Sequence, residues 1–166
     1  MVSAGRKFFG GFTYLGLLIA VALIGMSLAG AGTMWSSMRK RDNEQELLRI
    51  GSKFREAIGN YYNRTPGVIK QYPPDLQTLL HDNRFPMPQR YLRQIYADPF
   101  TGMRNWGILE APSGGVMGVY SLAGGKPQKV ANFREADKMF ENKDLYEEWI
   151  FVYLPMDEIL ERQSRE

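Results

Sequence analysis

The sequence contains no cysteine and a single histidine, His81. Without cysteine, neither a disulfide framework nor a thiolate metal site can form. A Ser-His-Asp triad would have to use His81, and no Gly-x-Ser-x-Gly elbow accompanies it. We interpret His81 as a surface residue and expect no enzymatic activity.

A phosphate-binding loop is also excluded. The segment Gly124-Gly125-Lys126 carries part of the Gly-x-x-x-x-Gly-Lys-Ser/Thr pattern, but Tyr120 stands at the first glycine position and Pro127 replaces the hydroxyl residue. This segment is instead typical of a turn after a strand.

Charged residues are missing from one long stretch, residues 8–38. Five of the 21 basic residues flank this stretch, so the part beyond it holds 16 basic residues against 18 acidic ones; the five are Arg6, Lys7, Arg39, Lys40 and Arg41. A nucleic-acid-binding protein concentrates positive charge on its folded domain. We therefore expect no nucleic-acid partner.

Residues 12–35 are long and apolar enough to cross a bilayer as a helix, which needs about 20 residues. We assign a transmembrane segment to residues 12–38. One interpretation is a permanent signal anchor. Another is a secretory signal peptide cut after Ala29-Gly30-Ala31, for which the apolar core is long and is prolonged by Met34 and Trp35.

The run from Gly10-Gly11-Phe12 to Gly25 resembles the class III signal of type IV pilins and type II secretion pseudopilins. The resemblance implies a leader of residues 1–11, cleavage by a prepilin peptidase between Gly11 and Phe12, and methylation of the new amine on Phe12. It also implies that Arg6 and Lys7 stay in the cytoplasm.

The chain departs from the family at the fifth mature position, where Gly16 replaces the usual glutamate. This change indicates a minor, tip or specialised subunit. The charges alone would place the C-terminus inside, because three basic residues follow the anchor and two precede it. The resemblance gives the opposite orientation, and we follow it.

Beyond the anchor, apolar residues recur at spacings of three and four and predict one face of a helix: Leu47, Ile50, Phe54, Ile58 and Tyr61. No proline precedes Pro66, so we expect the helix to continue through residues 39–63 and to stop at Pro66-Gly67.

Residues 64–166 are predicted to form a globular α+β part. Strands are expected at residues 105–110, 116–122 and 148–154, with a hairpin loop at residues 111–115. Residues 126–144 are expected to be a long polar excursion with a helical turn near residues 134–140.

Several short motifs occur in the order seen in the major-type pseudopilins: Arg90-Tyr91-Leu92, Asp98-Pro99-Phe100-Thr101-Gly102, Trp106, Gly118-Val119-Tyr120-Ser121-Leu122 and Trp149. The resemblance implies a pilin-like roll, in which a long N-terminal helix packs on a small antiparallel sheet. The family holds calcium in an acidic loop, but residues 123–129 contain no carboxylate here. We expect no cofactor; Asp137 and the Leu122 carbonyl are the only candidate calcium ligands.

The resemblance therefore predicts a structural pseudopilin subunit of the bacterial inner membrane, with a cytoplasmic N-terminus and a periplasmic C-terminal domain. Its implied partners are other pseudopilins, the prepilin peptidase, the inner-membrane assembly platform and lipid. Small residues would let helices approach closely in the filament: Gly16, Gly25, Ala29 and Gly30. The alternatives are an uncleaved, membrane-tethered periplasmic binding module and a soluble domain secreted after cleavage at Ala31.

Overall fold

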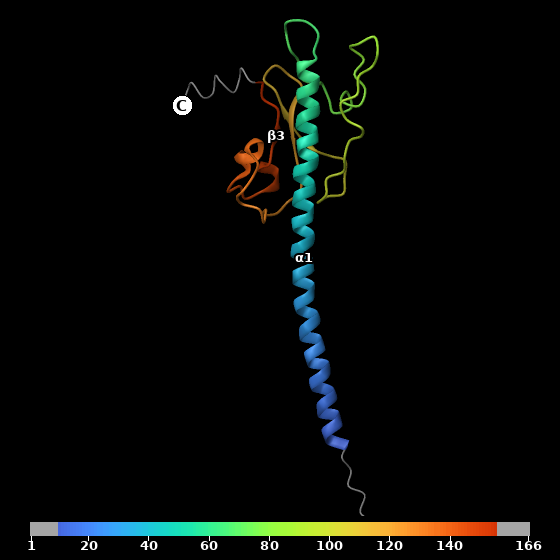
Figure 1. The fold of residues 1–166 in the computed structure, drawn as a ribbon, viewed down its shortest axis with the longest axis vertical. Helices are drawn as coiled ribbons and strands as arrows, with labels where there is room; N and C mark the ends of the chain where they lie inside the picture. Colours follow the sequence, from blue (N-terminus) through green and yellow to red (C-terminus); the bar gives the residue numbers. More distant parts are fainter. Residues whose placement is uncertain (1–9, 156–166) are drawn as a thin grey trace, which may run out of the picture. The chain divides into compact units, whose positions relative to one another are not determined.

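The computed structural model describes the backbone of residues 10–155 and the side chains of residues 14–25 and 35–155. The architecture is α+β: a long helix packs on a three-stranded antiparallel sheet (Figure 1). Contacts divide the chain into two units between Lys40 and Arg41. The sheet and the part of α1 that packs on it both lie within the second unit.

Helix α1 spans Gly10–Asn63 without interruption. The predicted apolar face is confirmed, because all five of its residues are at most 4% exposed: Leu47, Ile50, Phe54, Ile58 and Tyr61. The helix ends just before Pro66-Gly67, as expected. Gly67 has a φ of +88°, a left-handed conformation that glycine adopts without steric cost.

The sheet has the order β1-β2-β3. Strand β1 (Gly107–Glu110) pairs with β2 (Val116–Tyr120) as a hairpin that contains a register irregularity between Leu109 and Glu110. The predicted hairpin loop is confirmed: the Ala111 amide donates to the Gly115 carbonyl, and Gly114 and Gly115 both have positive φ. Strand β3 (Phe151–Val152) pairs antiparallel with β2.

The strands are shorter than the sequence predicts, and side-chain hydrogen bonds to other segments lie at the ends of β1 and β2. The Trp106 indole donates to the Tyr96 carbonyl at 2.9 Å, just before β1 begins. Ser121 follows β2. Its hydroxyl donates a hydrogen bond to the Asp98 carboxylate and accepts one from the Ala123 amide. Glu148, the first residue of the third expected strand, is instead the last residue of the 3₁₀ helix η2, Tyr146–Glu148.

The expected helical turn in the polar excursion is confirmed as the 3₁₀ helix η1, Glu135–Phe140. The ring of its last residue, Phe140, stacks on Trp149 and contacts Phe151 edge to face, so these three residues form an aromatic cluster. Phe151 in turn lies against Gly51 of α1, where a Cβ atom would collide with its ring. The helix and this part of the sheet therefore approach closely because position 51 has no side chain.

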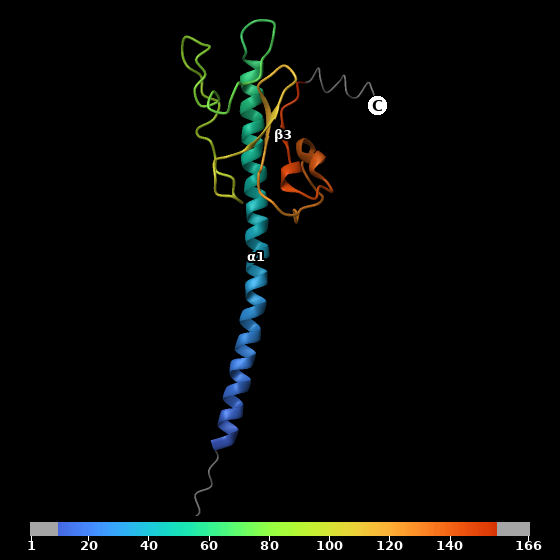
Figure 2. The same cartoon turned by 180° about the vertical axis from the view of Figure 1, so that it is seen from behind.

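Two loop-rich segments lie on opposite sides of α1 (Figures 1 and 2). On one side, residues 91–96 contact the helix, where the Lys53 ammonium lies 4.6 Å from the Tyr96 ring centroid. On the other side, Arg134 donates to the Ser52 hydroxyl and Arg55 pairs with Asp137. Successive residues of an α-helix are rotated by about 100°, so Lys53 and Arg55 point to different sides of α1.

We predict that Gly51→Ala destabilises the fold by about 1–3 kcal/mol, because Phe151 is fully buried and cannot move away from the new methyl group. The loss should exceed the helix-propensity gain of about 1 kcal/mol that alanine brings. Urea unfolding of the full chain in detergent, followed by near-ultraviolet circular dichroism, measures this difference.

The matched control is Gly59→Ala. Its Cβ would meet the ring of Tyr153, which is partly exposed, whereas Phe151 is fully buried. A loss at Gly59 equal to the loss at Gly51 would contradict the packing argument.

Candidate functional site

The most conspicuous feature of the first unit is a helical surface that is apolar on all sides. Between residues 14 and 25, eight large apolar side chains are exposed by 49–65%: Tyr14, Leu15, Leu17, Leu18, Ile19, Val21, Leu23 and Ile24. No charged residue interrupts them. A helix that is apolar all round is normally covered by protein or by lipid.

Small residues interrupt this surface at two of the predicted packing positions. A Cβ atom added at Gly16 or Gly25 would meet nothing within 4 Å, so both positions leave open space beside the helix. The surroundings of Ala29 and Gly30, the other two predicted packing residues, lie outside the described part. So do those of Gly11 and Phe12, whose backbone belongs to α1.

Among the residues that the structure describes, no helix combines the length and the apolar character needed to cross a bilayer. The predicted transmembrane segment, residues 12–38, includes residues 12, 13 and 26–34, whose side chains are not among those described.

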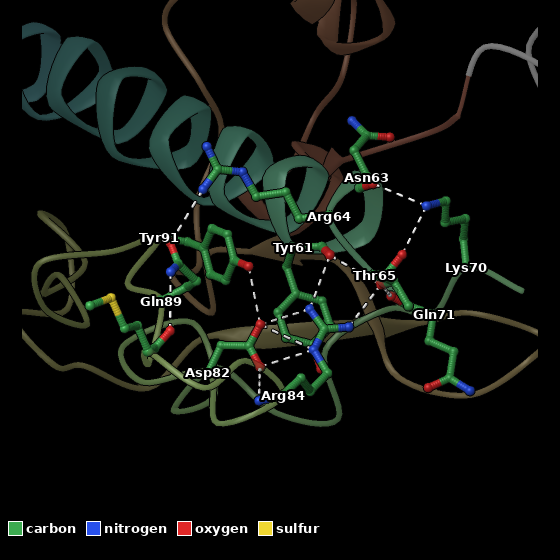
Figure 3. Close-up of polar contacts among 11 residues, drawn as sticks. Tyr61, Asn63, Arg64, Thr65, Lys70, Gln71, Asp82, Arg84, Gln89 and Tyr91 are labelled. Atoms are coloured by element: carbon green, nitrogen blue, oxygen red, sulfur yellow. Dashed lines mark hydrogen bonds and ion pairs between the residues drawn. The ribbon is translucent and has the colours of Figure 1, made fainter. Parts of the chain in front are cut away.

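A polar cluster holds the C-terminal end of α1 in the second unit (Figure 3). Its centre is Asp82, which is fully buried and binds the Arg84 guanidinium through both carboxylate oxygens, at 2.8–3.1 Å. Arg84 also donates to the Tyr61 carbonyl and to the Thr65 hydroxyl. Carbonyls in the last turn of a helix have no partner within the helix, and Arg84 supplies one from a distant loop.

The electrostatics of this cluster make Asp82 a fixed anion. Burial opposes its ionisation, but hydrogen bonds from Arg84, its backbone amide and Tyr91 outweigh that effect and hold the pKa of Asp82 below its usual value. Burial raises the pKa of Tyr61 and of Tyr91. Both phenols stay neutral at physiological pH, so the cluster serves as an anchor rather than as an acid-base pair.

A second buried carboxylate, Glu44 of α1, holds the loop in which the family resemblance places calcium. Glu44 accepts the backbone amides of Gln128 and Lys129 at 2.5 and 3.2 Å, and the Tyr146 hydroxyl at 2.8 Å. Burial and the contact with Glu44 raise the pKa of Tyr146. The loop is therefore held in place by a carboxylate that comes from helix α1.

Of the two candidate calcium ligands, Asp137 is engaged by two arginines and Leu122 lies at the surface. Asp137 is 1% exposed and pairs with Arg55 at 2.9 Å and Arg134 at 3.3 Å, while Leu122 is 40% exposed. Across the described residues, no three His, Asp or Glu side chains gather closely enough to hold a metal ion. His81 is exposed, and Gly125 has the positive φ of a turn residue.

Neither Glu44 nor Asp82 belongs to a motif or periodic pattern that the sequence predicts to be a site. One signal was available for Glu44: it lies three residues before Leu47 on the predicted apolar face, where a carboxylate is unusual. No comparable signal marks Asp82, because its segment has neither helical nor strand periodicity.

We predict that Asp82→Asn destabilises the folded chain by about 3 kcal/mol at pH 7, because the Arg84 charge loses its buried partner. Since the folded pKa of Asp82 is lowered, its stabilisation is complete above the unfolded value of about 3.9 and is lost as the pH falls through the folded pKa. When the pH falls below about 4, the free energy of unfolding should therefore decrease less for the variant than for the parent.

Urea unfolding measured between pH 3 and pH 7 tests this expectation. The control is Asp144→Asn, which removes an exposed ion pair with Lys126 and should change stability little. Equal losses for the two variants at pH 7 would contradict the anchoring role of Asp82.

Comparisons of this chain with protein-family models, with curated proteins and with solved structures found no match.

Proposed function

We propose that this protein is a pseudopilin, a structural subunit of a type II secretion or type IV pilus-like filament in the bacterial periplasm. The observation that carries the proposal is the exposed apolar surface at residues 14–25, which begins just after the Gly11-Phe12 signal. This surface belongs to the same uninterrupted helix, α1, that packs on the α+β part.

The proposal assigns residues 12–38 to the inner membrane, with the leader in the cytoplasm and the globular part in the periplasm. A prepilin peptidase removes residues 1–11, and the amine of Phe12 is methylated. The assembly platform then moves the subunit from lipid into the filament. In both environments lipid or protein covers the helix, as a helix that is apolar on all sides requires.

The mode of assembly follows from the small residues of the helix. Gly16 and Gly25 leave room for a neighbouring helix to approach, as small residues do in membrane helix pairs. Gly16 also means that no carboxylate has to be buried in the helix core, where an unpaired one would cost several kcal/mol. This feature supports a specialised position in the filament.

We predict that Gly11→Leu blocks processing, because the peptidase requires a glycine before the cut. Mass spectrometry of the chain from membranes of the native host should find the parent protein beginning at methylated Phe12 and the variant beginning at Met1. Gly10→Leu, one position earlier, is the control and should be processed. A parent chain that begins at Met1 would favour the tethered binding module, and one that begins at Gly32 would favour a secreted domain.

We further predict that Gly25→Leu weakens association between helices about tenfold, equivalent to about 1.4 kcal/mol, because a large side chain keeps a neighbouring helix at a distance. Energy transfer between labelled full-length chains in lipid vesicles measures the association. Val21→Leu, at another exposed position on the same helix, should leave it unchanged. Equal effects of the two substitutions would argue against close helix packing at Gly25.

A further inference from the structure

A groove, here called the loop groove, lies between α1 and residues 128–134, beside the first turns of the helix in the second unit. It consists of two adjoining cavities of about 420 and 300 Å³, which share four lining residues: Gln45, Leu48, Lys129 and Asn132. Glu44 holds the loop beside the helix by accepting the Gln128 and Lys129 amides. The shape of the groove therefore depends on the same hydrogen bonds that fix the loop.

The charged side chains that line the loop groove differ in number and in exposure. Four are basic and at least partly exposed: Arg41, Arg49, Lys129 and Arg134. Two are acidic, Glu44 and Asp137, and both are at most 2% exposed. Glu46, which pairs with Arg49, and Arg55, which pairs with Asp137, cancel each other. The groove therefore keeps an excess of positive charge, and the charge it exposes is basic.

Charges beside the groove do not remove this excess. Two neighbouring ion pairs are neutral: Lys126 with Asp144 and Lys138 with Glu135. Asp42 follows Arg41 in α1, does not line the groove, and lowers the excess by one charge at most. The surface around the groove stays positive when all of these residues are counted.

Two of the lining cations, Arg41 and Lys129, form no ion pair with a carboxylate among the described residues. The Lys129 ammonium donates to the Asn132 carbonyl at 2.9 Å and lies 4.8 Å from the Phe133 ring centroid. These contacts position the ammonium without neutralising it. The side-chain amides of Gln45 and Asn132 line the same groove, so the groove combines cations with N–H donors, as a phosphate group requires.

The loop also combines basic with exposed apolar residues. Residues 123–134 contain three basic residues and no acidic one. Val130, which is 45% exposed, and Ala131 line the groove next to Lys129. Basic residues beside exposed apolar ones are typical of surfaces that bind anionic membranes.

Under the proposed function, this groove lies at the surface of the membrane. Tyr14 and Trp35 are 65% and 69% exposed, and the 21 residues between them correspond to about 31 Å of helix. This length matches a hydrocarbon core of about 30 Å with an aromatic residue at each interface. Arg41 lies three residues beyond the assigned segment 12–38, or about 4.5 Å along the helix, which is within a headgroup layer of about 5–7 Å.

We propose that the loop groove binds the phosphate of an anionic phospholipid of the phosphatidylglycerol class, and that Arg41 and Lys129 are its charged partners. A zwitterionic headgroup carries an ammonium next to its phosphate and would bring a positive charge to a positive groove. The proposal rests on the filament function above and adds to it a lipid that the subunit holds while it is in the membrane and releases when it enters the filament.

Energy transfer from the full chain to labelled lipid in nanodiscs tests the proposal. The chain has no cysteine, so Gly124→Cys provides a single site for the donor dye, and a Cβ atom there meets nothing within 4 Å. The acceptor dye is attached to an acyl chain of phosphatidylglycerol or of phosphatidylcholine, which leaves both headgroups intact. Half-maximal transfer should require about tenfold less phosphatidylglycerol than phosphatidylcholine. Equal transfer to the two lipids would overturn the proposal.

Charge variants separate a site in the groove from general attraction to the membrane surface. Arg41→Gln with Lys129→Gln should abolish the preference for phosphatidylglycerol. Arg39→Gln with Lys40→Gln removes the same charge from residues that do not line the groove and should leave most of the preference. Arg41→Lys with Lys129→Arg keeps both charges and should preserve it. Equal losses in the two neutralised variants would overturn the proposal.

A competition experiment identifies the source of the phosphate. Inorganic phosphate in excess should leave the preference intact, because a free anion lacks the acyl chains that keep the lipid beside the loop. Loss of the preference would make the groove a site for free phosphate and would overturn the assignment to lipid.

The N-terminal mass of the chain from membranes of the native host separates this inference from the proposed function. A chain that begins at Phe12 but shows no preference for phosphatidylglycerol retains the pseudopilin function and refutes the lipid site. A chain that begins at Met1 and shows the preference retains the lipid site and refutes the processing. A Met1 chain without the preference refutes both.

Discussion

Buried carboxylates are the interaction on which the second unit depends. Its sheet is small, and long segments between the regular elements have no ladder of their own to satisfy their backbone groups. Three buried acidic residues accept backbone amides of these segments: Glu44, Asp82 and Asp98. A fourth buried acid, Asp137, pairs with Arg55 and Arg134. Burying a carboxylate is unfavourable unless it is paired or hydrogen-bonded. Each of these four therefore specifies one arrangement of the loop around it, because any other arrangement would leave the charge without partners.

The same arrangement determines which charges residues 82–105 show to solvent. The carboxylates that tie loops to the helix are inside, where their charge is taken up by Arg84, by Arg55 and Arg134, or by amide and hydroxyl donors. Because Asp98 and Asp82 are buried or paired, the loop that contains them shows only its arginines to solvent. The exposed arginines of this loop are thus a consequence of which acids the core uses.

Much of the fold was predictable from local patterns. The spacing of Leu47, Ile50 and Phe54 predicts the buried face because helical periodicity is a property of neighbouring residues, and the hairpin turn follows from its glycines. The role of Glu44 was not predictable in this way, since its partners lie 84 to 102 residues away in the chain. Gly51 gave no signal either: its importance appears only when Phe151 is placed beside it. The exposed apolar surface of the candidate site was evident from composition alone.

The distance in sequence between Glu44 and its partners has a consequence for the order of folding. A helix forms within about a microsecond and a hairpin within about ten microseconds, whereas a contact between residues 44 and 146 must close a loop of most of the domain, at a cost that grows with loop length. We expect the C-terminal third to join the structure last. Until then, the aromatic cluster around Trp149 remains accessible to water, so a newly made chain passes through an interval in which the core of its second unit is open.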